Sequence, residues 1–253
     1  MGQKQSHSKK NLVYGVHPIV EAIQAGKPLD KIMIRKGISK DRIQDIIALS
    51  QNFQIPIQSV PEATINRLCP GVNHQGMLAF VSEVVYQPLE EVILKTTEQG
   101  NTPLFVLLDG ITDVRNFGAI ARSAECMGVH ALIVPMSGAA PSNADAIKVS
   151  AGALHHIPVC REKNLVDSIL LLQSYGVQTV ACTEKAGDNI YQTDFSGPTC
   201  LIMGSEEKGI SNSILKRADL LAKIPMVGQV SSLNVSVATG MILSEVCRQR
   251  SFV

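Results

Sequence analysis

The sequence lacks several features that mark common classes of protein. None of its apolar runs approaches the ~20 residues that a membrane-spanning helix needs. No apolar segment follows the basic first ten residues, so we expect no secretory signal and a cytoplasmic location. The six cysteines include no C-x-x-C pair, which argues against a zinc site and against a disulfide scaffold. We therefore expect free thiols and no bound metal.

Sequence motifs of several enzyme classes are also missing. No G-x-G-x-x-G follows a predicted strand, so a standard dinucleotide site is not expected. A G-x-S-x-G elbow is absent, which removes the main signal for a serine hydrolase. The stretch from Gly204 to Ser211 nearly matches a phosphate-binding loop, but Ile210 stands where that loop requires lysine. We therefore do not expect hydrolysis of nucleoside triphosphates.

Composition and charge indicate a folded protein with a basic amino-terminal part. Apolar residues make up 45% of the chain, which supports a hydrophobic core. The net charge of the whole chain is +1, but residues 1–40 contain eight basic and two acidic residues, a net charge of +6. This asymmetry favours docking of a polyanion, although a solvated surface with a basic tail has the same composition. We expect residues 1–10 to form a disordered basic tail.

Hydrophobic periodicity divides the rest of the chain into two predicted domains. Residues 11–84 have the pattern of a small α/β unit, and the polar segment 85–102 ends in a cluster of helix and strand breakers, so we interpret it as a linker. From residue 103 onward, apolar strand patterns alternate with helical patterns. The expected strands are 104–108, 131–134, 177–181, 199–203 and 220–224, and the expected helices are 116–127, 143–150, 164–175, 211–218 and 233–249. This alternation predicts an α/β fold with a parallel sheet, helices on both faces and a ligand site at the carboxyl ends of the strands.

The first stretch that carries chemistry spans residues 109–125. Asn116 is expected to cap a helix whose buried stripe includes Phe117 and Ile120. Arg122 would lie about 9 Å along the helix axis from Asn116 and about 120° around it. The two side chains are therefore not expected to serve one atom within a single subunit. Arg122 is either a surface residue or part of a site shared with a second subunit.

Two further polar stretches follow later strands. Residues 203–209 form a glycine turn with Glu206, which suits ribose hydroxyls or a sulfonium ligand, although an acid at a helix start is the competing interpretation. Residues 224–236 form a loop of low charge, in which Pro225 ends a strand and Gly228 permits a turn. Such a loop suits a neutral ligand edge such as adenine, and it is equally compatible with a capped strand-to-helix turn.

Taken in order, residues 116–122, 203–209 and 224–236 resemble the three motifs of the SpoU/TrmH family. These proteins belong to the SPOUT superfamily and are S-adenosylmethionine-dependent RNA ribose 2′-O-methyltransferases. Residues 14–22 resemble the start of the family's RNA substrate-binding domain. The resemblance implies a substrate-binding domain over 11–84 and a methyltransferase domain over 103–253 that contains a deep trefoil knot. One departure is Asp113-Val114-Arg115, where many members have an acidic residue followed by proline.

The resemblance also implies a function and a set of site residues. It implies methylation of a guanosine ribose in large-subunit (23S) rRNA by a homodimer with a shared active site. Transfer to tRNA or to another rRNA site remains an alternative, as does a non-catalytic RNA-binding module. Arg122 would gather the target phosphate and oxygen, Asn116 and Ser232 would orient the ribose, and Asn234 would brace the loop; the general base stays open. The implied catalytic and substrate-contact residues are Asn116, Arg122, Glu206, Ser232 and Asn234, and the implied cofactor-binding residues are Gly204, Ile224, Met226 and Leu233.

Overall fold

The computed structural model describes residues 12–39, 41, 43–229 and 232–251. The chain divides into two compact units, residues 1–83 and 84–253. The expected tail, residues 1–10, lies outside the described residues. The expected linker over residues 85–102 is wrong, because α4 (Leu89–Glu98) buries Leu89, Val92 and Ile93 in the core of the second unit.

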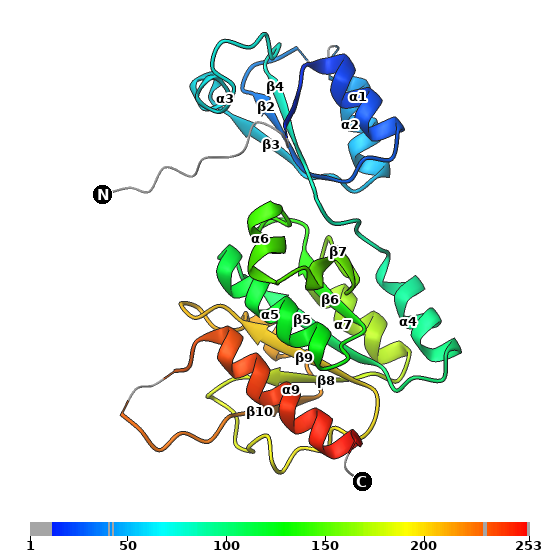
Figure 1. The fold of residues 1–253 in the computed structure, drawn as a ribbon, viewed down its shortest axis with the longest axis vertical. Coiled ribbons are helices and arrows are strands. Elements are labelled where there is room, and N and C mark those ends of the chain that lie inside the picture. Colours follow the sequence, from blue (N-terminus) through cyan, green and yellow to red (C-terminus); the bar gives the residue numbers. More distant parts are fainter. Residues whose placement is uncertain (1–11, 40, 42, 230–231, 252–253) are drawn as a thin grey trace. The chain divides into compact units, whose positions relative to one another are not determined.

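The first unit is a four-stranded mixed sheet with helices on both faces (Figure 1). Its strand order is β1-β4-β2-β3, with β4 antiparallel to both β1 and β2, and β3 parallel to β2. The elements are β1 (Leu12–Tyr14), α1 (Val16–Gln24), β2 (Leu29–Arg35), α2 (Gln44–Asn52), β3 (Ile57–Val60), α3 (Glu62–Leu68) and β4 (Met77–Val81). The small α/β unit expected from the sequence is therefore present.

The second unit contains the predicted parallel sheet. Its six strands are all parallel and run in the order β10-β8-β9-β5-β6-β7. The strands are β5 (Leu104–Asp109), β6 (Ala131–Pro135), β7 (Val159–Glu162), β8 (Gln178–Cys182), β9 (Thr199–Gly204) and β10 (Leu220–Ala222). The remaining elements are α5 (Val114–Cys126), α6 (Ala144–Val149), the 3-10 turn η3 (Ala153–His155), α7 (Leu165–Ser174), α8 (Asn212–Leu215) and α9 (Val235–Ser251).

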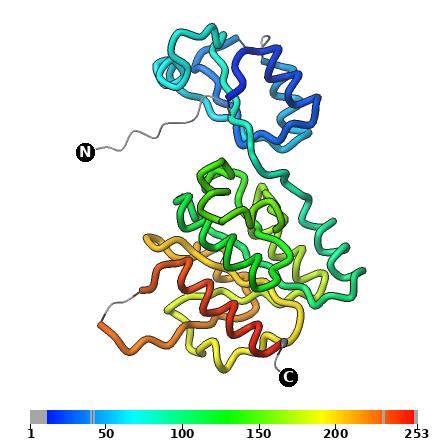
Figure 2. The backbone as a smooth tube through the Cα atoms, viewed as in Figure 1, coloured from blue at the N-terminus to red at the C-terminus, as the bar shows by residue number. Residues whose placement is uncertain are grey.

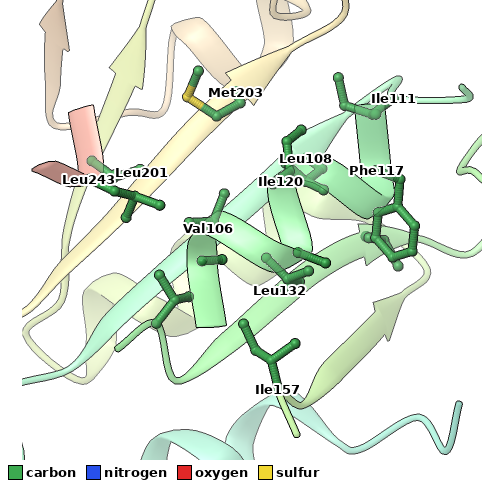
Figure 3. Close-up of a cluster of buried hydrophobic side chains, with 14 of the residues drawn as sticks. Val106, Leu108, Ile111, Phe117, Ile120, Leu132, Ile157, Leu201, Met203 and Leu243 are labelled. Atoms are coloured by element: carbon green, nitrogen blue, oxygen red, sulfur yellow. The ribbon is translucent and has the colours of Figure 1, made fainter. Parts of the chain in front are cut away.

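Alternating side chains of the central strand β5 supply two separate cores. Val106 and Leu108 face α5 and α9 in one core, which Figure 3 shows around Phe117, Ile120 and Leu243. Phe105 and Leu107 belong to the other core, with buried residues of α4, α7 and α8. Because the central strands are covered on both faces, whereas the edge strand β10 is partly exposed, polar groups collect at the strand ends, as expected for such a sheet.

The six cysteines are free thiols, as expected. Burial raises the pKa of Cys160 and of Cys182 to about 12, so neither is a ready nucleophile near neutral pH. Of the helices in the described residues, none combines the length and the apolar character needed to cross a membrane.

Candidate active site at the carboxyl end of the sheet

Two neighbouring strands and one long loop bring the three motif stretches together. Asp109, at the end of β5, is in register with Gly204, at the end of β9. After β10 the chain leaves the sheet in an extended loop and returns at the start of α9 (orange in Figure 2). α9 then packs against α5 on the same face of the sheet. The starts of α5 and α9 and the loop after β9 therefore form one site.

The start of α5 differs from the sequence expectation. The helix begins at Val114 and its N-cap is Asp113, whose Oδ1 accepts from the Asn116 backbone N–H at 2.9 Å. The prediction that Asn116 caps this helix is thus wrong. Asn116 lies in the first turn instead, and its side chain is free to make contacts outside the helix. Val114 stands at the first helical position, where proline is also favoured, so the departure from the family pattern leaves a normal helix start.

Glu206 joins the three motifs through one carboxylate oxygen. Its Oε1 accepts from Asn116 Nδ2 at 3.0 Å, from Asn234 Nδ2 and from the Val235 backbone N–H at 3.3 Å. Asn234 Nδ2 also donates to Asn116 Oδ1 at 3.0 Å. The carboxylate lies at the amino-terminal ends of both α5 and α9, where a negative charge is stabilised. Glu206 therefore acts at the start of α9, not as a starting acid of α8.

Both polar atoms of the Asn234 side chain are hydrogen-bonded to neighbouring residues. Its Oδ1 accepts from the Ser236 backbone N–H at 3.0 Å, from the Ser236 hydroxyl and from the Val237 N–H at 3.4 Å. This arrangement caps the start of α9, while the amide nitrogen is used by Glu206 and Asn116. Asn234 thus fixes the end of the loop to the other two motifs.

The loop that carries Glu206 is held from both sides. A Cβ on Gly204 would lie 2.2–2.5 Å from main-chain atoms of Gly209 and Ile210, so only glycine fits here. Asp109 Oδ2 accepts from the Ser211 backbone N–H at 2.7 Å, and the Ser205 carbonyl accepts from Gly209 N–H at 2.8 Å. The requirement for glycine at position 204 therefore has a packing reason, whatever its part in cofactor binding.

Sequence reasoning missed the anchoring roles of Asp109 and Asp113. No local pattern identifies the role of Asp109, because its partner Ser211 lies 102 residues away in the sequence. Asp113 could have been identified, because an aspartate three residues before the backbone N–H that donates to it has the ordinary spacing of an N-cap.

Arg122 and Ser232 are not part of this hydrogen-bonded cluster. Arg122 is exposed on α5, and no hydrogen bond or ion pair links its side chain to another residue in the described part of the chain. Ser232 is exposed in the loop before α9. The expected separation of Arg122 from Asn116 around the helix agrees with this placement.

The other expected cofactor residues line the loop between β10 and α9. Ile224 is half-buried and packs against the core beneath, whereas Met226 and Leu233 are 41% and 37% exposed. Val227, next to Met226, is fully exposed. Apolar side chains thus face solvent on a loop of low charge. Among the described residues, no group of three or more His, Cys, Asp or Glu could hold a metal ion.

Comparison with known proteins identifies relatives along the whole chain. Residues 103–244 match the model of the SpoU rRNA methylase family, and residues 12–87 match that of an RNA 2′-O ribose methyltransferase substrate-binding domain. The 23S rRNA (guanosine-2′-O-)-methyltransferase RlmB of Pseudomonas aeruginosa is 40% identical over 94% of this chain and 96% of its own length. RlmB of Vibrio parahaemolyticus is 39% identical over the same shares. The SpoU methyltransferase AviRb of Streptomyces viridochromogenes, solved in complex with AdoMet, aligns with a TM-score of 0.59 and 27% identity over 98% of this chain and 94% of that chain.

Proposed function

The chain belongs to the SpoU rRNA methylase family, and we propose that it transfers a methyl group from S-adenosylmethionine to the 2′-hydroxyl of a guanosine ribose in 23S rRNA. The observation that carries this function is the cluster in which Glu206 Oε1 gathers Asn116, Asn234 and the start of α9. Three motifs that are far apart in the sequence meet there, at the sheet edge where parallel α/β folds bind ligands.

The loop between β10 and α9 has the chemistry that an adenosine group requires. Ile224, Met226 and Leu233 offer apolar contacts, and the backbone groups around Gly204 offer neutral hydrogen-bond partners at the end of β9. We therefore assign these four residues to cofactor binding. When bound, S-adenosylmethionine supplies an electrophilic methyl group on a sulfonium sulfur.

The protein's own residues must position and activate the ribose oxygen. A 2′-hydroxyl is a poor nucleophile, so it has to be aligned and to lose its proton during the reaction. In this mechanism Arg122 binds the phosphate beside the target and draws the hydroxyl into place. Arginine is a poor base at its usual pKa and would have to lose a proton before it could accept one, so the general base stays open between the neighbouring phosphate and Arg122.

Asn116 and Ser232 orient the ribose, while Glu206 and Asn234 hold Asn116 in place. The amide of Asn116 cannot rotate without breaking its hydrogen bonds to Glu206 and to Asn234. Since Asn234 also caps α9, its own position is set by that helix. The geometry of the nucleophile's surroundings is thereby fixed before substrate binds, which lowers the cost of alignment.

We also assign the enzyme to a homodimer with active sites shared between subunits. Arg122 is exposed and lies away from the Glu206 cluster. On α9, Val237 and Met241 are 52% and 39% exposed and line an open groove of about 480 Å³ together with Tyr191. Ser244 and Glu245 also line this groove, and its exposed apolar side chains favour a protein contact. A second subunit bound there would cover the groove and bring its own arginine toward this site.

A complementation experiment tests the shared site. Arg122→Ala and Glu206→Ala enzymes are each expected to be inactive. If Arg122 acts across the dimer, a mixture of the two variants forms hybrid dimers that contain one intact site, and activity returns. A mixture that stays inactive although hybrid dimers form would place Arg122 in its own subunit's site. A stable, fully active monomer in sedimentation would exclude the dimer.

Two further assignments accompany the family membership. We infer a deep trefoil knot within residues 103–253, which tracing the chain in an experimental structure would test. We also infer action in the cytoplasm, where bacterial ribosomal RNA is processed, and fractionation of cells that produce the tagged protein would test this.

The experiment for the function itself compares RNA from a strain with and without the gene. Mapping of ribose methylation should show one 23S rRNA guanosine that loses its 2′-O-methyl group in the deletion strain. Purified protein should restore that mark in vitro with S-adenosylmethionine. Loss of a tRNA methyl group instead would correct the substrate. Absence of both methyl transfer and cofactor binding would indicate an RNA-binding module without catalysis.

A further inference from the structure

The sheet of the first unit is covered unevenly by its helices. On one face, α1 and α2 bury a continuous apolar layer that includes Ile32 and Ile34 of β2 and Ala79 of β4. On the other face, α3 covers chiefly Met33, Val60 and Leu78. Figure 1 shows α1 and α2 on one side of this sheet and α3 on the other. On the α3 side, Leu12 of β1 and Phe80 of β4 pack only against the edge of this cluster, so the described residues leave this part of the face partly open.

Strand register identifies the side chains on this open part. Leu12 of β1 is paired with Phe80 of β4, which is paired with Lys31 of β2. Tyr14 lies two residues from Leu12 on the same face of β1, because alternate residues of a strand share a face. Tyr14 is 43% exposed, and Leu12, Lys31 and Phe80 are half-buried. We call these four residues the open sheet face.

Aromatic and cationic groups lie next to each other on the open sheet face. Lys31 Nζ is 5.0 Å from the centroid of the Phe80 ring, a cation–π contact that keeps the ammonium at the sheet surface. Tyr14 is a diagonal cross-strand neighbour of Phe80, at a typical distance of about 7–8 Å. None of the four residues is acidic. The face thus offers two aromatic rings and a fixed positive charge.

We propose that the open sheet face binds unpaired nucleotides of the RNA substrate, with a base stacked on Tyr14 and against Phe80 and with Lys31 at a phosphate. The inference rests on the proposed function, because it takes the partner to be RNA. Bases stack on exposed aromatic side chains, and nearby cations attract the backbone, which is the usual chemistry of single-strand binding. The match of residues 12–87 to a substrate-binding domain supports RNA as the occupant rather than another protein.

Binding of labelled oligoadenylate to the full chain, followed by fluorescence anisotropy, tests this assignment. Tyr14→Ala should weaken binding by about 5- to 150-fold, the range for loss of one stacked base. Tyr14→Phe keeps the ring and should bind like the wild type. Lys31→Met keeps the alkyl chain but loses the charge. It should therefore reduce the magnitude of the slope of log K against log salt concentration by about 0.7. Phe53→Ala is the matched control, since Phe53 is an aromatic residue of the same unit that is 52% exposed but lies outside this face.

Several results would overturn the inference. Unchanged affinity of Tyr14→Ala, or an RNA duplex that competes as well as the single strand, would exclude a stacking site. A change in sedimentation mass of Tyr14→Ala without a change in RNA affinity would show that the face joins two copies of the chain. Methylation of 23S rRNA by the wild type separates the two proposals. If the wild type methylates RNA and Tyr14→Ala has the same KM for RNA, only this inference fails, whereas a wild type that methylates no RNA contradicts the proposed function itself.

Discussion

Replacing Glu206 with glutamine tests the role of the carboxylate at the meeting point of the three motifs. Glutamine is nearly isosteric and keeps one acceptor oxygen, but it removes the negative charge. In the structure, one oxygen of Glu206 accepts three N–H groups, from Asn116, Asn234 and Val235. Glutamine also brings an NH₂ group that can point toward the Asn234 amide nitrogen, where it would repel instead of accept.

The size of the effect follows from the bonds that change. A hydrogen bond to a charged group contributes about 1.5–3 kcal/mol, and a neutral one about 1 kcal/mol. Glu206 is exposed, so water can replace much of what is lost, and we expect the free energy of unfolding to fall by about 1 kcal/mol or less. The cost to catalysis should be larger, because a displacement of about 1 Å at the reacting groups can lower the rate by about 100-fold. We expect kcat to fall by about 10- to 100-fold for Glu206→Gln, and further for Glu206→Ala.

Single-turnover methyl transfer with saturating RNA and cofactor, together with thermal unfolding, measures both effects. Glu207→Gln is the control, since this neighbour is also exposed and no hydrogen bond of its side chain occurs within the described residues. Asn234→Ala should not add its full effect to that of Glu206→Gln, because the two residues share one network. Wild-type kcat in Glu206→Gln, or strict additivity in the double variant, would refute the role of Glu206 as the organiser of the site.

Three other predictions concern the framework around the site. Gly204→Ala should abolish methyl transfer and destabilise the fold by about 1–3 kcal/mol, because the added methyl group would collide with the main chain of the following loop. Gly228→Ala is the control, since a Cβ there meets open space and should change neither property. Urea unfolding and activity assays measure both effects. Arg250→Ala should lower the free energy of unfolding by about 2–4 kcal/mol in urea titration, because this half-buried guanidinium donates to four backbone carbonyls, those of Thr102, Pro103, Phe195 and Gly197. Burial lowers the pKa of His130, whose Nδ1 accepts from the Leu104 N–H, so the folded state favours the neutral ring. The free energy of unfolding should therefore decrease as pH falls below about 6.5, where the unfolded chain gains the proton more readily. His130→Gln should remove that dependence in thermal unfolding measured across pH.

The layered core could be predicted because its signal is local and repeated. Apolar strands such as β5 and β9 are continuous, buried runs, and the helices between them show a regular apolar stripe. β7 was missed because it contains four residues, too few for a periodic signal. β7 also includes Arg161 and Glu162, whose charges hide an edge strand. Short strands of this kind are defined by their partners rather than by their own sequence.

The supposed linker shows a different limit of sequence reasoning. Residues 85–102 are polar overall, and α4 has an exposed face that includes Leu94 at 43% exposure. Its inner face is nevertheless buried against the core of the second unit, where Val92 and Ile93 lie with residues of α7. A helix with a narrow apolar stripe is difficult to distinguish from a polar connector, because composition averages the two faces.

Site residues could be named from the motifs, but their contacts could not. The bonds from Glu206 reach 90 residues back to Asn116 and 28 residues forward to Asn234. No periodicity encodes such separations. Asn116 was correctly expected at the start of a helix, but the capping role was assigned to the wrong residue. Asp113 caps the helix, and the side-chain amide of Asn116 is therefore available to the site. That single shift of position determines whether Asn116 stabilises its own helix or faces the other two motifs.

The side chains of an exposed polar cluster keep a defined geometry only if buried contacts hold the backbone segments that carry them. Asn116 lies on α5 and Asn234 directly precedes α9, and the two helices pack together and place Ile120 and Leu243 in the same buried cluster (Figure 3). The Glu206 loop is pinned separately by the main-chain contact at Gly204. Water competes with each hydrogen bond of the cluster, so those bonds alone could not hold three segments in one geometry. The apolar helix contact and the glycine contact therefore set the distances, and the hydrogen bonds select one arrangement of side chains among those that the framework permits.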